Sequence, residues 1–239
     1  MLPLATSHPP GIDVVWFKRD LRTVDHAPLR AVAADPAPGG VIYLYAFEPD
    51  QLADPTSDPR HVRLVEEALA DLDADLRRLG AHLTVLEGRM PNLLDELQVR
   101  FGPIRTLHAH QETGHLASYA RDRRVRAWCR RHGVPWNEAN QDGVERGLTH
   151  RAGWAQRWNR FIRTLPHGEP AQLPPSADRN RPEARFAPST ATRPGGLHRL
   201  RGGRREAEAR LATFLYDRGR TYTADMATPN EGWDACSRL

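Results

Sequence analysis

The chain has 239 residues, of which 39% are hydrophobic and 27% charged, with a formal net charge of +4. This composition suits a globular protein with one domain of about 150 residues around a hydrophobic core, plus a smaller remainder. It excludes a membrane-spanning or secreted protein, because no apolar run approaches ~20 residues and residues 1–13 lack the pattern of a secretory signal.

We therefore expect a cytoplasmic protein that is a monomer and does not contact membranes. The two cysteines, Cys129 and Cys236, lie far apart and belong to no CxxC or Cys/His cluster. The sequence thus predicts reduced thiols, with neither a disulfide framework nor a metal site. The high pI is weak support for nucleic-acid binding, because Lys18 is the only lysine among 34 basic residues and the arginine bias matches a GC-rich gene.

Strands and helices alternate along the first part of the chain with short connections. The expected strands are apolar runs at 12–17, 40–47, 82–88, 104–110 and 134–140, and the expected helices lie at 26–35, 59–80, 91–101 and 116–133. The helix at 59–80 has a clear apolar stripe and ends on a glycine suited to a left-handed cap. Asp25 is predicted to cap the helix that begins near residue 26. The alternation predicts an α/β fold with a doubly wound, five-stranded parallel Rossmann-like sheet.

The loop after the first strand is the first candidate for a ligand site. It runs from Lys18 to Asp25, and in doubly wound sheets ligands bind beyond the carboxyl ends of the strands. Its charges are predicted to order the loop through Arg–Asp pairs drawn from Arg19, Asp20, Arg22 and Asp25. Neither GxGxxG nor GxxxxGK[ST] occurs, so a nucleotide-like ligand would be bound without a glycine-rich phosphate loop.

The character of the chain changes after the α/β part. Seven prolines fall between Thr164 and Gly203, and residues 177–205 carry eight arginines against two acids, which suits a solvated linker or a nucleic-acid contact. The helix expected at 204–220 has an apolar face that one helix cannot bury alone, so we expect a truncated helical segment. The predicted organisation is a disordered N-terminus at 1–11, an α/β domain at 12–162, a connector at 163–203 and the truncated start of a helical domain at 204–239.

An ordered series of motifs resembles the DNA photolyase and cryptochrome family. It comprises "VVWFKRDLRTVDHAPL" near the start, then "ETG…YARDRRVRAW", "QDGVERGL", "GGRREAEARLATFLYDRGRTY" and the final "CSRL". The resemblance implies an antenna-type α/β domain, a connector and the beginning of an FAD-binding helical domain. It also implies a light-driven flavoprotein that repairs pyrimidine dimers in damaged DNA, or a cryptochrome that uses its flavin for signalling.

The same resemblance suggests residues that contact FAD in a full-length form. Tyr222 matches a flavin-contacting tyrosine, and the first four positions of a phosphate-contacting Thr-Ser-x-Leu-Ser loop are matched by Cys236, Ser237, Arg238 and Leu239. Cysteine replaces threonine there, and the last serine is absent. We expect this chain alone to retain no FAD and to be inactive, and no catalytic residue is assigned.

The antenna site is approached in the same way. Ala117 and Ser118 stand where folate-binding relatives have an Asn-Glu pair, which argues against folate bound in the usual manner. A deazaflavin or flavin antenna in the crevice at the strand ends is the remaining candidate, with Lys18 contacting a phosphate and Gln111 and Glu112 hydrogen-bonding a polar ring edge. An alternative for Glu112 is that it only caps the following helix.

Two other readings of the chain remain open. One is a stand-alone nucleotide-binding α/β module, of the universal-stress-protein or electron-transfer-flavoprotein kind, without enzymatic activity. The other is a nucleic-acid-binding fragment that acts through the arginine-rich connector, with an affinity that falls steeply with salt.

Overall fold

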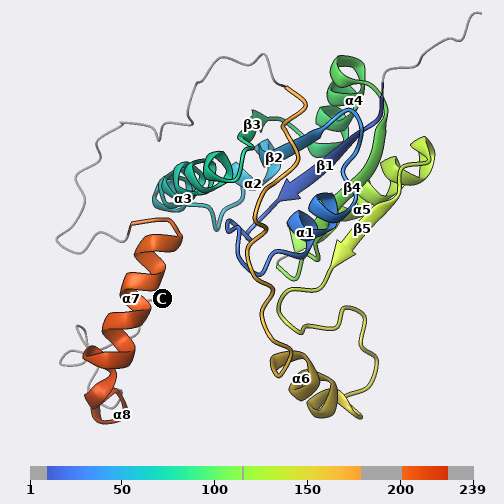
Figure 1. The fold of residues 1–239 in the computed structure, drawn as a ribbon. Helices are drawn as coiled ribbons and strands as arrows, with labels where there is room; N and C mark the ends of the chain where they lie inside the picture. The colour runs from blue at the N-terminus through green and yellow to red at the C-terminus, as the bar shows by residue number, and fades with distance from the viewer. Residues whose placement is uncertain (1–9, 115, 179–200, 226–239) are drawn as a thin grey trace, which may run out of the picture.

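A five-stranded parallel sheet forms the centre of the molecule (Figure 1). The computed structural model describes residues 10–114, 116–178 and 201–225. The strand order is β3-β2-β1-β4-β5, and the strands are β1 (Ile12–Phe17), β2 (Val41–Phe47), β3 (Leu83–Glu87), β4 (Ile104–His110) and β5 (Trp136–Ala139). All four pairings are parallel, so the predicted doubly wound α/β fold is confirmed.

Helices cover both faces of the sheet, because its central strands are apolar on both sides. On one face, Val14 and Trp16 of β1 pack against α4 (Met90–Phe101) and α5 (Leu116–His132). On the other face, Val15 and Phe17 pack against α1 (Ala27–Ala34) and α3 (Pro59–Arg78). Alternate side chains of β1 thus belong to two different hydrophobic cores. Packing on both faces fixes the position of the carboxyl end of β1.

Local signals account for the ends of the helices, with one correction. Gly80, directly after the C-cap of α3, has a φ of +89°, as the predicted left-handed cap requires. The N-cap of α1 is His26 and not Asp25 as predicted, because the side chain of His26 accepts the Leu29 N–H. Asp25 has a φ of +53°, unlike the extended backbone of an N-cap, and its carboxylate instead accepts the His167 N–H.

The first part of the proline-rich segment lies along the sheet. It follows α6 (Trp154–Ile162), and its buried Leu173 joins the core formed with α3. The Tyr43 hydroxyl donates to the Pro174 carbonyl at 2.8 Å, and the Ala177 N–H donates to the Val41 carbonyl at 2.9 Å. These contacts fix the path of the chain across the amino ends of the strands as it leaves the α/β part.

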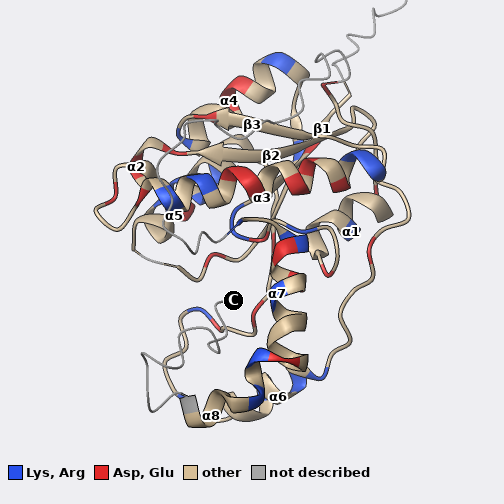
Figure 2. Ribbon diagram, turned by 90° about the vertical axis from the view of Figure 1, so that its left-hand side faces the viewer, with Lys and Arg blue, Asp and Glu red and all other residues tan. Residues whose placement is uncertain are grey.

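The helix α7 (Arg204–Tyr216) begins next to α3 and extends away from the sheet (Figure 1). Charged residues of both signs gather where it begins (Figure 2). Its Leu211 and Leu215 side chains are exposed by 41% and 61%. The 3-10 turn η1 (Arg218–Thr221) and the short helix α8 (Tyr222–Asp225) complete the segment. None of the helices in the described ranges has both the length and the apolar character needed to cross a membrane.

Candidate functional site

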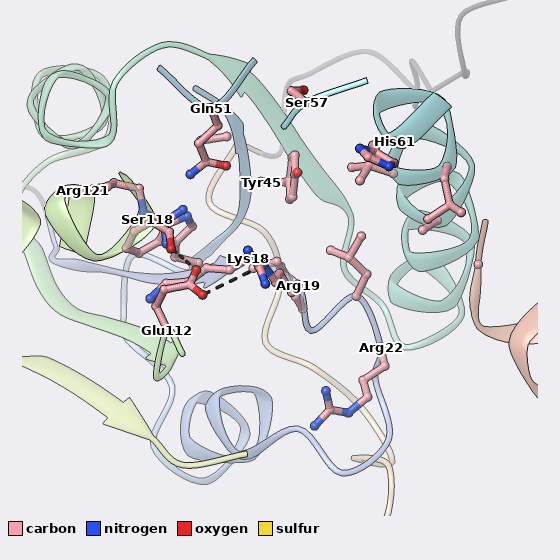
Figure 3. Close-up of a pocket in the computed structure, with 18 of the residues that line it drawn as sticks. Lys18, Arg19, Arg22, Tyr45, Gln51, Ser57, His61, Glu112, Ser118 and Arg121 are labelled. Carbon is pink, nitrogen blue, oxygen red and sulfur yellow. Dashed lines mark hydrogen bonds and ion pairs between the residues drawn. The ribbon is translucent and has the colours of Figure 1, made fainter. Parts of the chain in front are cut away.

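A cavity of about 670 Å³ lies beyond the carboxyl ends of β1 and β2 (Figure 3). Its lining combines aromatic, charged and small polar side chains from the β1 loop, β2, the segment before α3, α3 itself, α5 and the start of α7. The volume is in the range of small-molecule and cofactor sites. The position agrees with the rule that ligands of doubly wound sheets bind beyond the strand ends.

Buried charges form the wall on the α5 side. The Arg121 side chain is only 6% exposed and donates to Glu112 at 2.9 Å and to Asp122 at 2.9 Å. Its Nε also lies 3.5 Å from Glu48, and its guanidinium lies 4.7 Å from the centre of the Trp16 ring. Burial raises the pKa of Glu48, and the charge of Arg121 opposes that shift. One guanidinium therefore pairs with carboxylates from three separate parts of the chain.

Lys18 reaches the same wall, but its ammonium group is already bonded. Its Nζ donates to Asp122 at 2.9 Å and to the His110 carbonyl at 3.1 Å, and it lies 4.4 Å from the centre of the Trp16 ring. Burial lowers the pKa of Lys18, and the charge of Asp122 opposes that shift. The lysine thus closes the floor of the cavity and ties β1 to α5.

Arg19 is the exposed cation of the β1 loop. Its side chain is 61% exposed, and its Nε lies 4.0 Å from Glu112 Oε1. The glycine at 114 makes this approach possible, because a Cβ there would lie 2.6 Å from the Arg19 guanidinium and 2.7 Å from Glu112. In Figure 3 Arg19 extends into the cavity above Glu112.

Three aromatic side chains lie at the cavity. Trp16 is among the lining residues but is only 1% exposed, so it belongs to the floor beneath Lys18. Burial raises the pKa of Tyr45 to about 12, so this phenol stays protonated and serves as a hydrogen-bond donor. Phe17 is fully buried on the opposite face of β1 from Trp16, so the half-buried Tyr45 is the aromatic ring that a flat, conjugated ligand can contact.

The β1 loop is held by a buried His–Asp–His cluster and not by the predicted Arg–Asp pairs. Asp20 Oδ2 lies 2.9 Å from His26 Nε2 and 2.6 Å from His110 Nδ1, and Asp20 Oδ1 accepts the Lys18 N–H. The guanidinium of Arg22 donates to the Val24 and Asp25 carbonyls. Asp20 therefore pairs with histidines, and Arg22 orders the loop through its backbone.

This cluster is the one group of three potential metal-binding side chains in the described part of the chain. His26 Nδ1 already accepts the Leu29 N–H, so His26 Nε2 carries the proton and donates to Asp20. A metal-bound histidine normally donates its second ring nitrogen outward, which the Leu29 N–H prevents here. The geometry thus fits a hydrogen-bonded cluster.

The cluster makes the stability of the fold depend on pH near neutrality. Burial lowers the pKa of His26, and Asp20 opposes the shift, so the folded protein favours neutral His26. In the unfolded chain His26 has an ordinary histidine pKa of about 6.5 and binds a proton more readily than in the folded protein. The free energy of unfolding should therefore fall as the pH drops below about 6.5. His26→Asn keeps a helix-capping oxygen without a titrating ring and should flatten this slope between pH 7.5 and 5.5.

Urea denaturation of both proteins at several pH values, monitored by circular dichroism, measures how the free energy of unfolding depends on pH. Burial also lowers the pKa of His108, which therefore gives both proteins the same remaining slope. Equal slopes for the two proteins would contradict this role of His26.

Of the three residues proposed for antenna binding, Lys18 and Glu112 line the cavity, whereas Gln111 is not among the lining residues and donates its backbone N–H to the Ala139 carbonyl. Ser118, which stands at one position of the folate-binding pair of relatives, also lines the cavity. Glu112 also accepts the Gly114 N–H just before α5, so both suggested roles suit its position.

Among the residues proposed for FAD, the structure describes Tyr222, which is not part of the cavity lining. Tyr222 begins α8 and packs edge-on against Phe214, with 37% of its surface exposed. Cys236, Ser237, Arg238 and Leu239 lie outside the described residues.

Sequence reasoning missed several residues of the cavity. They are Tyr45, Gln51, Ser57, His61 and Arg121. Tyr45 could have been found, because the carboxyl end of β2 must lie next to that of β1 in the predicted sheet. Arg121 could not, since nothing distinguishes it from the other charged residues of α5 until burial is known.

The sequence model described as DNA photolyase matches residues 13–144, which is more than half of the chain. The chain belongs to the DNA photolyase family. Among curated relatives of this photolyase-family protein, a cryptochrome DASH from Gloeobacter violaceus is 34% identical over 108 residues, which are 41% of this chain and 20% of the relative. A (6-4)DNA photolyase from Oryza sativa is 35% identical over 85 residues, which are 32% of this chain and 15% of that protein.

Solved structures of the family share the fold over most of the chain. The Synechocystis cryptochrome superposes with a TM-score of 0.70 at 19% identity, covering 91% of this chain and 49% of its own. A photolyase from Sulfolobus tokodaii, solved with two FAD molecules, gives a TM-score of 0.60 at 21% identity, covering 84% and 46%. The photolyase-family chain thus spans about half the length of these structures and about a fifth of the curated relatives.

Proposed function

We propose that this protein is a photolyase-type flavoprotein whose α/β domain holds a light-harvesting chromophore of flavin or deazaflavin type. The observation that carries the proposal is the cavity beside β1, which combines the half-buried Tyr45 ring and aliphatic side chains of α3 with a charged wall around Arg121. An isoalloxazine or deazaflavin ring has flat apolar faces that pack against such side chains and polar edges that suit the charged side chains.

The Sulfolobus tokodaii photolyase, solved with two FAD molecules and described as implying a novel light-harvesting cofactor, supports a flavin in this role. Arg19 suits a flavin phosphate better than Lys18 does, because the lysine ammonium is already bonded to Asp122. Ser118 lines the cavity, and with Ala117 beside it the carboxylate of the usual folate-binding pair is missing.

The remaining activity follows from the family and is part of the same proposal. In a complete photolyase or cryptochrome, FAD bound by a helical domain uses the light energy, either to repair pyrimidine dimers in damaged DNA or to signal. Tyr222 is the described residue that we propose for an FAD contact. Cys236, Ser237, Arg238 and Leu239 remain predictions from the sequence.

The test is a titration of the chain with FMN, riboflavin, FAD and a folate, followed by fluorescence and by retention after gel filtration. We expect one flavin per chain with an affinity on the order of micromolar, and weaker binding of the folate. Ser57→Trp, at the rim of the cavity, should reduce flavin binding, whereas Val99→Trp, at a position 90% exposed on α4, should not. Equal binding by the two variants, or no flavin binding by the natural chain, would refute the proposal.

A further inference from the structure

The start of α7 forms one side of the cavity. Gly203, Arg204 and Ala207 belong to its lining, although the β1 loop that forms another side lies far away in the sequence. The cavity is therefore complete only when α7 is docked against the α/β domain.

Docking rests on close contacts with α3. The Gly202 N–H donates to Glu67 at 2.8 Å, and the Arg205 side chain and N–H both donate to Asp71, at 2.7 and 3.1 Å. A Cβ at Gly202 would lie 1.9 Å from the Leu64 carbonyl oxygen, so only glycine allows this approach. Leu64 also lines the cavity, so the same part of α3 contacts Gly202 and forms the cavity wall.

Two arginines of the lining suit an anionic group on a ligand. Arg19 comes from the β1 loop and is largely exposed, with Glu112 4.0 Å away. Arg204 comes from α7 and forms an ion pair at 2.7 Å with Glu208, one turn further along the same helix and 57% exposed. An exposed pair of this kind is weak, so a phosphate can replace Glu208 at little cost.

We propose that α7 is a ligand-dependent wall of the cavity: Arg204 and Arg19 together bind the phosphate of the chromophore, and this binding and the docking of α7 on α3 strengthen each other. The inference rests on the proposed function, because it needs a phosphate-bearing flavin in this cavity. Reciprocity follows from thermodynamic linkage, since a ligand that contacts α7 only when it is docked must favour the docked state.

A substitution that changes no charge gives the first test. Gly202→Ala in the full chain should weaken FMN binding by about tenfold, because the methyl group pushes α7 from α3 while touching no ligand. Gly168→Ala is the matched control, since a Cβ there meets nothing within 4 Å. Equal FMN affinities for the two variants, measured by flavin fluorescence, would overturn the inference.

Charge changes give tests of opposite sign. Asp71→Asn removes a negative charge, so simple electrostatics would strengthen FMN binding, whereas loss of docking should weaken it. Arg204→Gln should weaken FMN roughly tenfold and leave riboflavin, which lacks the phosphate, unchanged. Stronger FMN binding by Asp71→Asn, or an equal loss of both flavins by Arg204→Gln, would refute the proposed role of α7.

Hydrogen exchange tests the reciprocal effect and separates the two proposals. FMN should slow exchange of the amides at the start of α7 in the natural chain, and the effect should vanish in Gly202→Ala. If FMN binds but α7 exchange does not change, only the coupling fails. If neither FMN nor riboflavin binds, the proposed function fails and the coupling with it.

Discussion

Arg121→Gln is expected to lower the free energy of unfolding by about 3–5 kcal/mol, the usual cost of removing one partner from a buried ion pair. The guanidinium is 6% exposed and is the shared partner of Glu112, Asp122 and Glu48. Glutamine keeps part of the length and one amide donor group, but it removes the charge that these carboxylates share. Chemical denaturation followed by circular dichroism measures the loss, and flavin titration should show weaker binding as the wall loosens.

Arg124→Gln is the matched control, one turn further along α5. Arg124 pairs with Asp50 at 3.1 Å, but its side chain is 47% exposed, so water replaces the lost contact and stability should change little. If the two variants were equally stable, the carboxylates around Arg121 would not need its charge. In that case the buried wall of the cavity would be held by packing alone.

Most of the fold could be predicted because its strands are apolar enough to be buried on both faces. The predicted run at 12–17 matches β1, and the runs at 40–47 and 104–110 match β2 and β4 to within one residue. Two alternating hydrophobic faces in one strand imply helices on both sides, and the order of elements then implies a parallel sheet. The four-residue helix α2 (Pro49–Leu52) was missed, because one turn carries no periodicity.

The candidate site could be predicted in place but not in detail. The loop after β1 was expected at the ligand edge, and its Lys18 and Arg19 do line the cavity. The expected Arg–Asp pairs were wrong because they assumed neighbours in sequence. Asp20 instead contacts His110, and Lys18 contacts Asp122; each partner is about a hundred residues away in the sequence. These residues come close only because β4 and α5 pack against β1.

Asp20→Asn is expected to cost about 3 kcal/mol, because one buried acceptor position becomes a donor. His26 cannot exchange its proton between ring nitrogens, since its Nδ1 is held by the Leu29 N–H. The amide oxygen must then face the two histidines, and the amide NH₂ group is turned toward the Lys18 N–H, which lies 2.7 Å from the carboxylate in the natural protein. Two donors would face each other with no acceptor between them.

The matched control is Asp25→Asn in the same loop. Asparagine tolerates the left-handed backbone at this position and can still accept the His167 N–H, so stability should change little. Equal stabilities of the Asp20 and Asp25 variants would contradict the assigned role of Asp20.

The pH dependence of the Asp20 variant adds a test with a definite sign. Burial acts to raise the pKa of Asp20, but hydrogen bonds from His110 and His26 outweigh it and hold the pKa well below the ordinary value. The stability that this carboxylate contributes is therefore complete above about pH 4 and is lost as the pH falls through the lower value. Urea denaturation should show that the gap between the natural protein and Asp20→Asn shrinks from about pH 4 toward pH 3, the range in which this carboxylate takes up its proton in the unfolded chain. A gap that widened on acidification would mean that the folded protein prefers protonated Asp20, and the histidines would then not be its donors.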